Sequence, residues 1–217
     1  MPDATQNESV TRSHEMTADD PLAQDPLAQD PLVQFDRWLR EAEASEPNDP
    51  NACALATATA GGAPSVRMVL AKRVGEERFC FFTNAESQKG LQIAENPRAA
   101  LCFHWKSLRR QVRVEGSVTG LSGEASDIYF HSRSRGSQIG AAVSDQSRVL
   151  LSREALEAKA RNFAEAYPGE IPRPAYWRGF CLHPERIEFW LNGPDRLHDR
   201  FLFVRDAGRW RQSRLFP

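Results

Sequence analysis

The stretch from Ile187 to Phe203, IEFWLNGPDRLHDRFLF, constrains the fold of this chain most strongly. Two apolar, aromatic-rich segments flank the turn signal Asn192-Gly193-Pro194. Before the turn, apolar side chains occupy every second position, as in a strand that turns one face toward a core. The pattern therefore predicts a β-hairpin with one buried face.

Three basic or ionisable side chains follow this turn at every second position: Arg196, His198 and Arg200. In a strand that resumes directly after the turn, they would line one face at intervals of roughly 6.6 Å. Two guanidiniums and an imidazole on one face call for an anionic ligand opposite them. The alternative is an exposed edge hairpin with solvated charges. The apolar flanks and the preceding Trp190 favour the ligand site.

The length of 217 residues suits one domain or two small ones, with enough chain for a substantial core. The hydrophobic content of 41% and charged content of 26% are ordinary for a globular protein. The formal net charge of -1 argues against a general binder of nucleic acid or of acidic membranes. Any anion must therefore be held by local clusters of Arg and Lys.

The cysteine pattern indicates neither a zinc site nor a disulfide framework. None of the 4 cysteines forms a C-x-x-C pair or has His at zinc-like spacing, and three lie in apolar runs. We expect buried free thiols, no metal and a reducing compartment. No apolar run approaches the ~20 residues of a membrane span, and the polar, acidic N-terminus is unlike a signal peptide. The expected location is cytoplasmic.

Residues 1–29 are rich in polar residues and proline, which predicts a disordered tail. A DPLAQ repeat occurs in this tail, and its third copy, DPLVQ, begins at Asp30. Asp30 suits a helix N-cap and Pro31 the first helical position, so a helix is expected from there to about Ser45.

The remainder, residues 30–217, is predicted to be one mainly β (α+β) domain. Closely spaced strands imply an antiparallel meander that curls into a barrel, with helices inserted. The expected strands are 52–60, 64–74, 78–83, 99–105, 110–121, 177–183, 186–191, 199–205 and 209–214. Helices are expected at 87–95, at 122–131 and from Ser152, the last with a buried stripe that includes Leu156 and Phe163.

Three further segments contain candidate ligand-binding groups. In RMVLAK, Arg67 and Lys72 have opposite strand parity, so a regular strand cannot aim both at one point. In FFTNAESQKG, hydroxyls and Lys89 gather before a helix N-terminus, a plausible phosphate cradle. In YFHSRSRGSQIG, a helix would place Tyr129, Arg133 and Ser137 on one face, which suits a phosphate monoester.

Each of these segments also has a plain structural interpretation, as solvated strand ends, a simple helix cap or a polar helix face. No nucleophile elbow, Walker A motif or G-x-G-x-x-G motif is present. The chemistry is therefore expected to belong to a bound organic cofactor. Several separate basic patches suggest more than one phosphate.

Together these segments identify a family. The run IEFWLNGPDRLHDR resembles the C-terminal signature of pyridoxine/pyridoxamine 5′-phosphate oxidases. The segments RMVLAK, FFTN-x-x-S-x-K, RQVRVEG, YFHSRSR-x-SQIG and SDQS are similar to that family in the same order. The resemblance covers about Asp30 to Pro217.

The resemblance implies a split β-barrel that dimerises and binds FMN where the two subunits meet. The reaction would pass a hydride from C4′ of the substrate to flavin N5, and dioxygen would reoxidise the flavin to give hydrogen peroxide and pyridoxal 5′-phosphate. Arg196 and His198 would be catalytic, over the pyridine ring. By motif position, the implied substrate contacts are Lys72, Tyr129, Arg133, Ser137, Arg196, Leu197 and His198. The implied FMN contacts are Arg67, Met68, Val69, Leu70, Ala71, Lys72, Phe82, Thr83, Gln88, Lys89, Gln111, Gln146, Ser147, Trp190 and Arg200.

Two departures from the family pattern leave alternatives open. Gln88 stands where the family usually has a basic residue, and the tail lacks a basic-aromatic segment that covers the substrate in some members. A phenazine-type split-barrel oxidase is one alternative, but it would not need Lys72 and the Tyr129 set for a phosphate. A non-catalytic FMN or pyridoxal phosphate binder is another, but it would not need Arg196 and His198.

Overall fold

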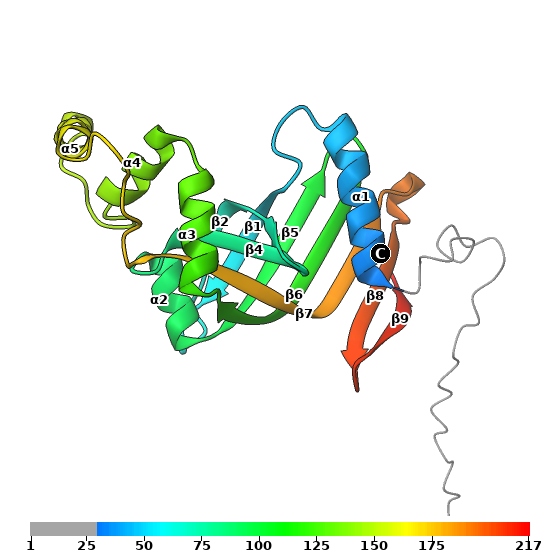
Figure 1. Cartoon of the computed structure of the whole chain (residues 1–217). Coiled ribbons are helices and arrows are strands. Elements are labelled where there is room, and N and C mark those ends of the chain that lie inside the picture. The colour runs from blue at the N-terminus through cyan, green and yellow to red at the C-terminus, as the bar shows by residue number, and fades with distance from the viewer. Residues whose placement is uncertain (1–29) are drawn as a thin grey trace, which may run out of the picture.

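The computed structural model describes residues 30–217 (Figure 1). The predicted disordered tail, with two copies of the DPLAQ repeat, lies outside the described residues. The helices are α1 (Pro31–Ser45), α2 (Gln88–Glu95), α3 (Gly123–Ser132), α4 (Arg135–Val143), α5 (Arg153–Ala166) and the short 3-10 helix η2 (Pro194–Arg196). The strands are β1 (Ala52–Ala58), β2 (Pro64–Leu70), β3 (Lys72–Val74), β4 (Glu77–Asn84), β5 (Arg98–Trp105), β6 (Arg110–Gly120), β7 (Trp177–Leu191), β8 (Asp199–Asp206) and β9 (Arg209–Leu215).

All of these strands join one antiparallel sheet in the order β2-β1-β5-β6-β7-β4-β3, with β8 paired to β7 and β9 paired to β8. The 15-residue strand β7 organises it. Its first half pairs with β4 and its second half with β8, while β6 pairs along nearly its whole length. The sheet therefore divides along β7, which confirms the predicted curled, mainly antiparallel architecture.

The prediction of two strands at 177–183 and 186–191 is wrong, because β7 runs through both. The register between β6 and β7 shifts at Glu115 and Gly116 instead of breaking. A β-bulge of this kind bends a strand without ending it. A Cβ atom at Gly116 would lie 1.9 Å from the His183 carbonyl oxygen, so only glycine fits this close approach.

Helix α1 begins as predicted, because the Asp30 carboxylate accepts a hydrogen bond from the Leu32 N–H at 2.8 Å. Its apolar face packs Phe35 against Phe103 at 5.0 Å and Trp38 against Phe189 at 5.0 Å between ring centroids. Figure 1 shows α1 near β8 and β9, whereas α3, α4 and α5 gather at the other end of the sheet. The two ends of the sheet are therefore covered by different helices.

Two side-chain predictions are wrong. Cys80 and Cys181 face each other across β4 and β7 and form a disulfide, whereas Cys53 and Cys102 are free. The sequence could not predict this bond, because it depends on the register of strands 101 residues apart. Helix α5 has no fully buried residue, so its apolar stripe is only half-buried. No helix within residues 30–217 is long and apolar enough to cross a membrane.

Candidate functional site

Lys89 is the centre of a polar cluster between the end of β4 and the start of α2. Its ammonium donates to Gln146 Oε1 at 2.6 Å, Ser87 Oγ at 3.1 Å and Thr83 Oγ1 at 3.2 Å. The side chain is buried, with 8% exposed, and no carboxylate among the described residues contacts it. Burial, with a smaller contribution from the charge of Arg67, lowers the pKa of Lys89 to about 8. The cluster therefore holds a destabilised cation that an anion would stabilise.

Arg67, on β2, is held toward the same region by neutral oxygens. Its guanidinium donates to Thr57 Oγ1 and Ser65 Oγ, each at 2.5 Å, and burial lowers the pKa of Arg67. Thr57 in turn donates to Gln92 on α2 at 2.6 Å. Gln88 and Ser147 also meet here, because the Gln88 N–H donates to Ser147 Oγ at 3.2 Å.

The strand that carries Arg67 stops before Lys72. β2 ends at Leu70 and β3 begins at Lys72, and the intervening Ala71 N–H donates to the Asn51 carbonyl at 2.9 Å. The opposite strand parity expected for Arg67 and Lys72 therefore does not restrict them. The Lys72 ammonium lies 5.9 Å from the centroid of the Tyr129 ring, as a cation–π contact.

The prediction of one helix face for Tyr129, Arg133 and Ser137 is wrong. Helix α3 ends at Ser132, Arg133 is its C-cap, and α4 begins after its own N-cap, Ser134. The break still brings Arg133 and Ser137 to one cavity of about 330 Å³, which Phe82 and Trp177 also line. Tyr129 stacks on Phe82 with ring centroids 4.0 Å apart, so it lies next to this cavity.

Arg133 lines this cavity and has one hydrogen-bond donor without a partner. Its Nη1 is buried and has no hydrogen-bond partner. Its guanidinium lies over the Trp177 ring, 5.0 Å from the centroid, and burial lowers the pKa of Arg133. A buried donor without a partner costs free energy, and a bound anion would remove that cost.

The C-terminal hairpin differs from its prediction. Arg196 lies in η2 with φ 63°, and β8 begins only at Asp199, so Arg196 and His198 do not share a strand face with Arg200. Gly193 causes this longer turn: its N–H donates to His198 Nδ1 at 3.2 Å. The adjacent Leu197 is 69% exposed.

Other groups gather around this turn. The His198 ring lies 4.5 Å from Trp190, and Trp190 pairs with Gln111 on β6 and with Arg200 on β8. Arg200 donates to the buried carboxylate of Glu188 at 2.8 Å. The turn and the end of β7 thus bring together the residues predicted around the substrate ring and part of the flavin.

The candidate residues therefore form two groups, at opposite ends of β7. Phe82 pairs with Gly179 near its start, and Gln111 pairs with Trp190 near its end. The eleven steps along the chain from residue 179 to residue 190 correspond to as much as about 36 Å in a strand. Within one chain, Arg133 and Arg196 thus belong to different ends of the sheet, as α3 and β8 do in Figure 1.

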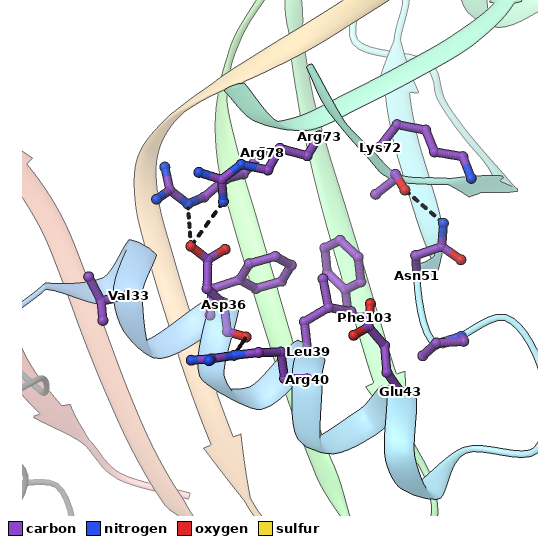
Figure 2. Close-up of a pocket in the computed structure, with 13 residues that line it drawn as sticks. Val33, Asp36, Leu39, Arg40, Glu43, Asn51, Lys72, Arg73, Arg78 and Phe103 are labelled. Atoms are coloured by element: carbon purple, nitrogen blue, oxygen red, sulfur yellow. Dashed lines mark hydrogen bonds and ion pairs between the residues drawn. The ribbon is translucent and has the colours of Figure 1, made fainter. Parts of the chain in front are cut away.

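A larger cavity of about 740 Å³ lies between α1 and the strands β3 and β4 (Figure 2). Asp36 in its wall pairs with Arg73 at 3.2 Å and with Arg78 at 2.9 Å. Arg73 also pairs with Glu76 at 3.6 Å, so two carboxylates balance the two guanidiniums of this cluster, which joins α1 to β3 and β4. Lys72 lines one side of this cavity, as Figure 2 shows.

Sequence reasoning missed several residues that support the candidate site. Thr57, Ser65, Trp177 and Glu188 each contact a predicted site residue. Of these four residues, only Glu188 could be noticed in the sequence, because the strand alternation places it on the polar face with Trp190. The other contacts depend on pairings between distant segments.

Family models match the segments that contain both groups of candidate residues. The family model for pyridoxamine 5′-phosphate oxidase matches residues 39–166, and that for the pyridoxine 5′-phosphate oxidase C-terminal dimerisation region matches 177–217. A pyridoxine/pyridoxamine 5′-phosphate oxidase of Erythrobacter litoralis (strain HTCC2594) is 56% identical over 84% of this chain and 89% of its own. One of Gluconobacter oxydans (strain 621H) is 54% identical over 84% of this chain and 92% of its own.

Two solved structures share the fold. PhzG from Burkholderia lata 383, in complex with tetrahydrophenazine-1-carboxylic acid, has a TM-score of 0.84 at 32% identity and covers 91% of this chain and 96% of its own. An FMN-binding, pyridoxamine 5′-phosphate oxidase-related protein from Nostoc punctiforme PCC 73102 has a TM-score of 0.71 at 18% identity, over 87% and 98%. Together with the sheet topology, these likenesses confirm the predicted split-barrel fold.

Proposed function

The chain belongs to the pyridoxamine 5′-phosphate oxidase family, and we propose that it oxidises pyridoxine and pyridoxamine 5′-phosphates to pyridoxal 5′-phosphate with dioxygen. Relatives with that enzyme's name are 47% to 56% identical to this chain. One structural observation carries the proposal: the described residues contain two cationic groups that are not paired with a carboxylate, Lys89 with Arg67 and Arg133 by itself. Thr83 and Gln146, which accept hydrogen bonds from Lys89, also line the cavity of Arg133. Two phosphate monoesters, one on a cofactor and one on a substrate, match the two cationic groups.

The cofactor is FMN, and the Lys89 cluster fits its phosphate. Lys89 and Arg67 supply two positive charges, and Thr83, Ser87 and Ser147 supply hydroxyls at the N-terminus of α2. When bound, FMN accepts a hydride from the substrate and is reoxidised by dioxygen, with release of hydrogen peroxide. The other proposed FMN contacts on this side are Met68, Val69, Leu70, Ala71, Lys72, Phe82, Gln88 and Gln146.

We assign the substrate phosphate to Lys72, Tyr129, Arg133 and Ser137. Arg133, whose buried Nη1 has no hydrogen-bond partner, and Ser137 line one cavity, and Lys72 reaches the neighbouring Tyr129 ring. These residues bind and orient the substrate, and they contribute no proton transfer. Charge-assisted hydrogen bonds from a guanidinium and an ammonium suit a phosphate dianion.

The other half of the site would come from a second subunit. The C-terminal segment matches a dimerisation region, which supports a homodimer. Because Arg196, Leu197 and His198 lie at the far end of β7 from Arg133, we propose that they reach the substrate of the partner subunit. Gln111, Trp190 and Arg200 would contact the partner's flavin in the same way. Arg196 would orient the pyridine ring and His198 would assist its binding.

The phenazine-type alternative has a specific relative, PhzG, but at 32% identity it is more distant than the oxidases above. A non-catalytic binder would hold both phosphates without turning over. A cytoplasmic location remains a prediction from the sequence.

One experiment separates these functions. The purified protein with bound flavin is mixed without oxygen with a phosphorylated vitamer, either pyridoxine 5′-phosphate or pyridoxamine 5′-phosphate, or with unphosphorylated pyridoxine. We expect the flavin absorbance to bleach with the phosphorylated vitamer and to recover on aeration. No bleaching with either phosphorylated vitamer would refute the oxidase. Equal bleaching with phosphorylated and unphosphorylated pyridoxine would refute the assignment of Arg133 to the substrate phosphate.

A further inference from the structure

Arg133 differs from most partly buried arginines of this protein. Seven arginines in residues 30–217 are partly buried, and five of them pair with a carboxylate: Arg78, Arg110, Arg113, Arg173 and Arg200. The two exceptions are Arg67 and Arg133, both in the proposed site. Arg67 is held by hydroxyls and carbonyls. What holds Arg133 is the face of an indole, Trp177.

Trp177 is a rigid support for this contact. It is 5% exposed at the start of β7, stacks on Phe82 at 5.3 Å and meets Phe130 edge to face at 5.2 Å. Its carbonyl accepts a hydrogen bond from Arg173 at 2.7 Å. The indole is therefore fixed by packing and by its backbone, independently of any ligand.

A cation–π contact leaves a guanidinium usable in a way that an ion pair does not. The N–H groups of arginine lie in the plane of the guanidinium, so a ring that covers its face leaves the N–H edge free. A carboxylate would occupy that edge and cancel the charge. Here the edge is unused, because the buried Nη1 has no partner, and the cavity beside it is lined by no carboxylate among the described residues.

We propose that Trp177 is a positioning residue for the substrate clamp: it holds the guanidinium of Arg133 by its face, with the N–H edge toward the phosphate. The role rests on the proposed function, because it takes Arg133 as a ligand of the substrate phosphate. Trp177 does not itself contact the phosphate. It fixes the orientation of Arg133 without neutralising its charge.

The test measures binding without turnover. The probe is 4-deoxypyridoxine 5′-phosphate, which lacks the oxidisable hydroxyl, and its unphosphorylated form, each titrated calorimetrically into the flavin-loaded enzyme. The ratio of the two affinities isolates the contribution of the phosphate. Trp177→Leu should lower this ratio by about tenfold, whereas Trp177→Phe, which keeps an aromatic face, should stay within about threefold of the wild type.

A matched control removes another indole under an arginine. Arg205 lies 5.9 Å from the Trp210 ring on β8 and β9, far from the cavity in the topology, so Trp210→Leu should leave the ratio unchanged. Flavin content is measured in every variant. A loss of flavin in Trp177→Leu that accounts for the whole change in affinity would overturn the positioning role.

Two arginine variants separate the inference from the function on which it rests. If Arg133→Met leaves the ratio unchanged, the assignment of the substrate phosphate fails. If Arg133→Met lowers the ratio but Trp177→Leu does not, only the role of Trp177 fails. If Trp177→Leu does not fold, Arg133→Lys provides the test. Lysine keeps the positive charge but has no planar face, so Arg133→Lys should lower the affinity ratio by about tenfold, as expected for Trp177→Leu. A wild-type ratio in Arg133→Lys would contradict the proposal.

Discussion

At the scale of single residues, the site is distinguished by how its cations are held. Lys89, Arg67 and Arg133 are all at least partly buried, yet each is surrounded by hydroxyls, amides, carbonyls or an aromatic face. The sequence predicted these residues from motif positions. It could not predict their partners, because Thr57, Gln146 and Trp177 come from distant segments.

The buried Lys89 makes flavin affinity depend on pH. Its pKa of about 8 in the protein without flavin lies below the ordinary lysine value of 10.5. Between these values the folded protein binds fewer protons at Lys89 than the unfolded chain, so this residue makes the flavin-free protein more stable as pH rises. A flavin phosphate needs the charged form. We therefore expect flavin affinity to fall as pH rises above about 8, by at most about tenfold per pH unit.

Fluorescence titration of the flavin-free protein between about pH 7 and pH 9.5 measures this slope. Lys89→Met should bind flavin more weakly and should lose the dependence attributed to Lys89. A wild-type affinity that stays constant or increases over this range would show that Lys89 does not hold the phosphate.

At the scale of elements, β7 and its three partner strands, β4, β6 and β8, position the candidate site. The alternation from Ile187 to Leu191 correctly predicted a strand with a buried face. It did not predict where the next strand begins, because η2 and its positive φ angles at Asp195 and Arg196 separate the turn from β8. A period-two pattern cannot reveal such a turn, which depends on the close approach of Gly193 to Leu197.

The Cys80–Cys181 disulfide joins β4 to β7 beside Phe82, so it should stabilise the flavin end of the sheet. It closes a loop with a sequence separation of 101 residues, which lowers the conformational entropy of the unfolded chain. We expect reduction, or Cys80→Ala, to lower the free energy of unfolding by about 2–4 kcal/mol in urea denaturation. Cys102→Ala removes a free cysteine, so reduction should lower the free energy of unfolding of this variant as much as that of the wild type. A wild-type denaturation midpoint that is the same with and without reductant would contradict this role.

At the scale of the whole molecule, the two groups of proposed site residues lie at opposite ends of β7. Family motifs in the sequence predict both groups, and the assignment of these residues to the site remains a prediction. Their separation could not be predicted, since it depends on the length of β7 and on which strand pairs with each half. Exposed apolar side chains along the edge strand β2, such as Val66 at 67% and Met68 at 66%, are consistent with cover by a second copy.

We propose that each active site takes Arg133 from one subunit and Arg196 from the other, and this shared site has a direct test. It is tested by co-expressing Arg133→Met and Arg196→Ala chains with different tags and purifying the doubly tagged dimer. Each such dimer would have one site with both residues intact and one with neither. We predict a turnover of about half the wild-type value per dimer, although each parent homodimer is nearly inactive. A mixed dimer no more active than the mean of its parents would contradict the shared site.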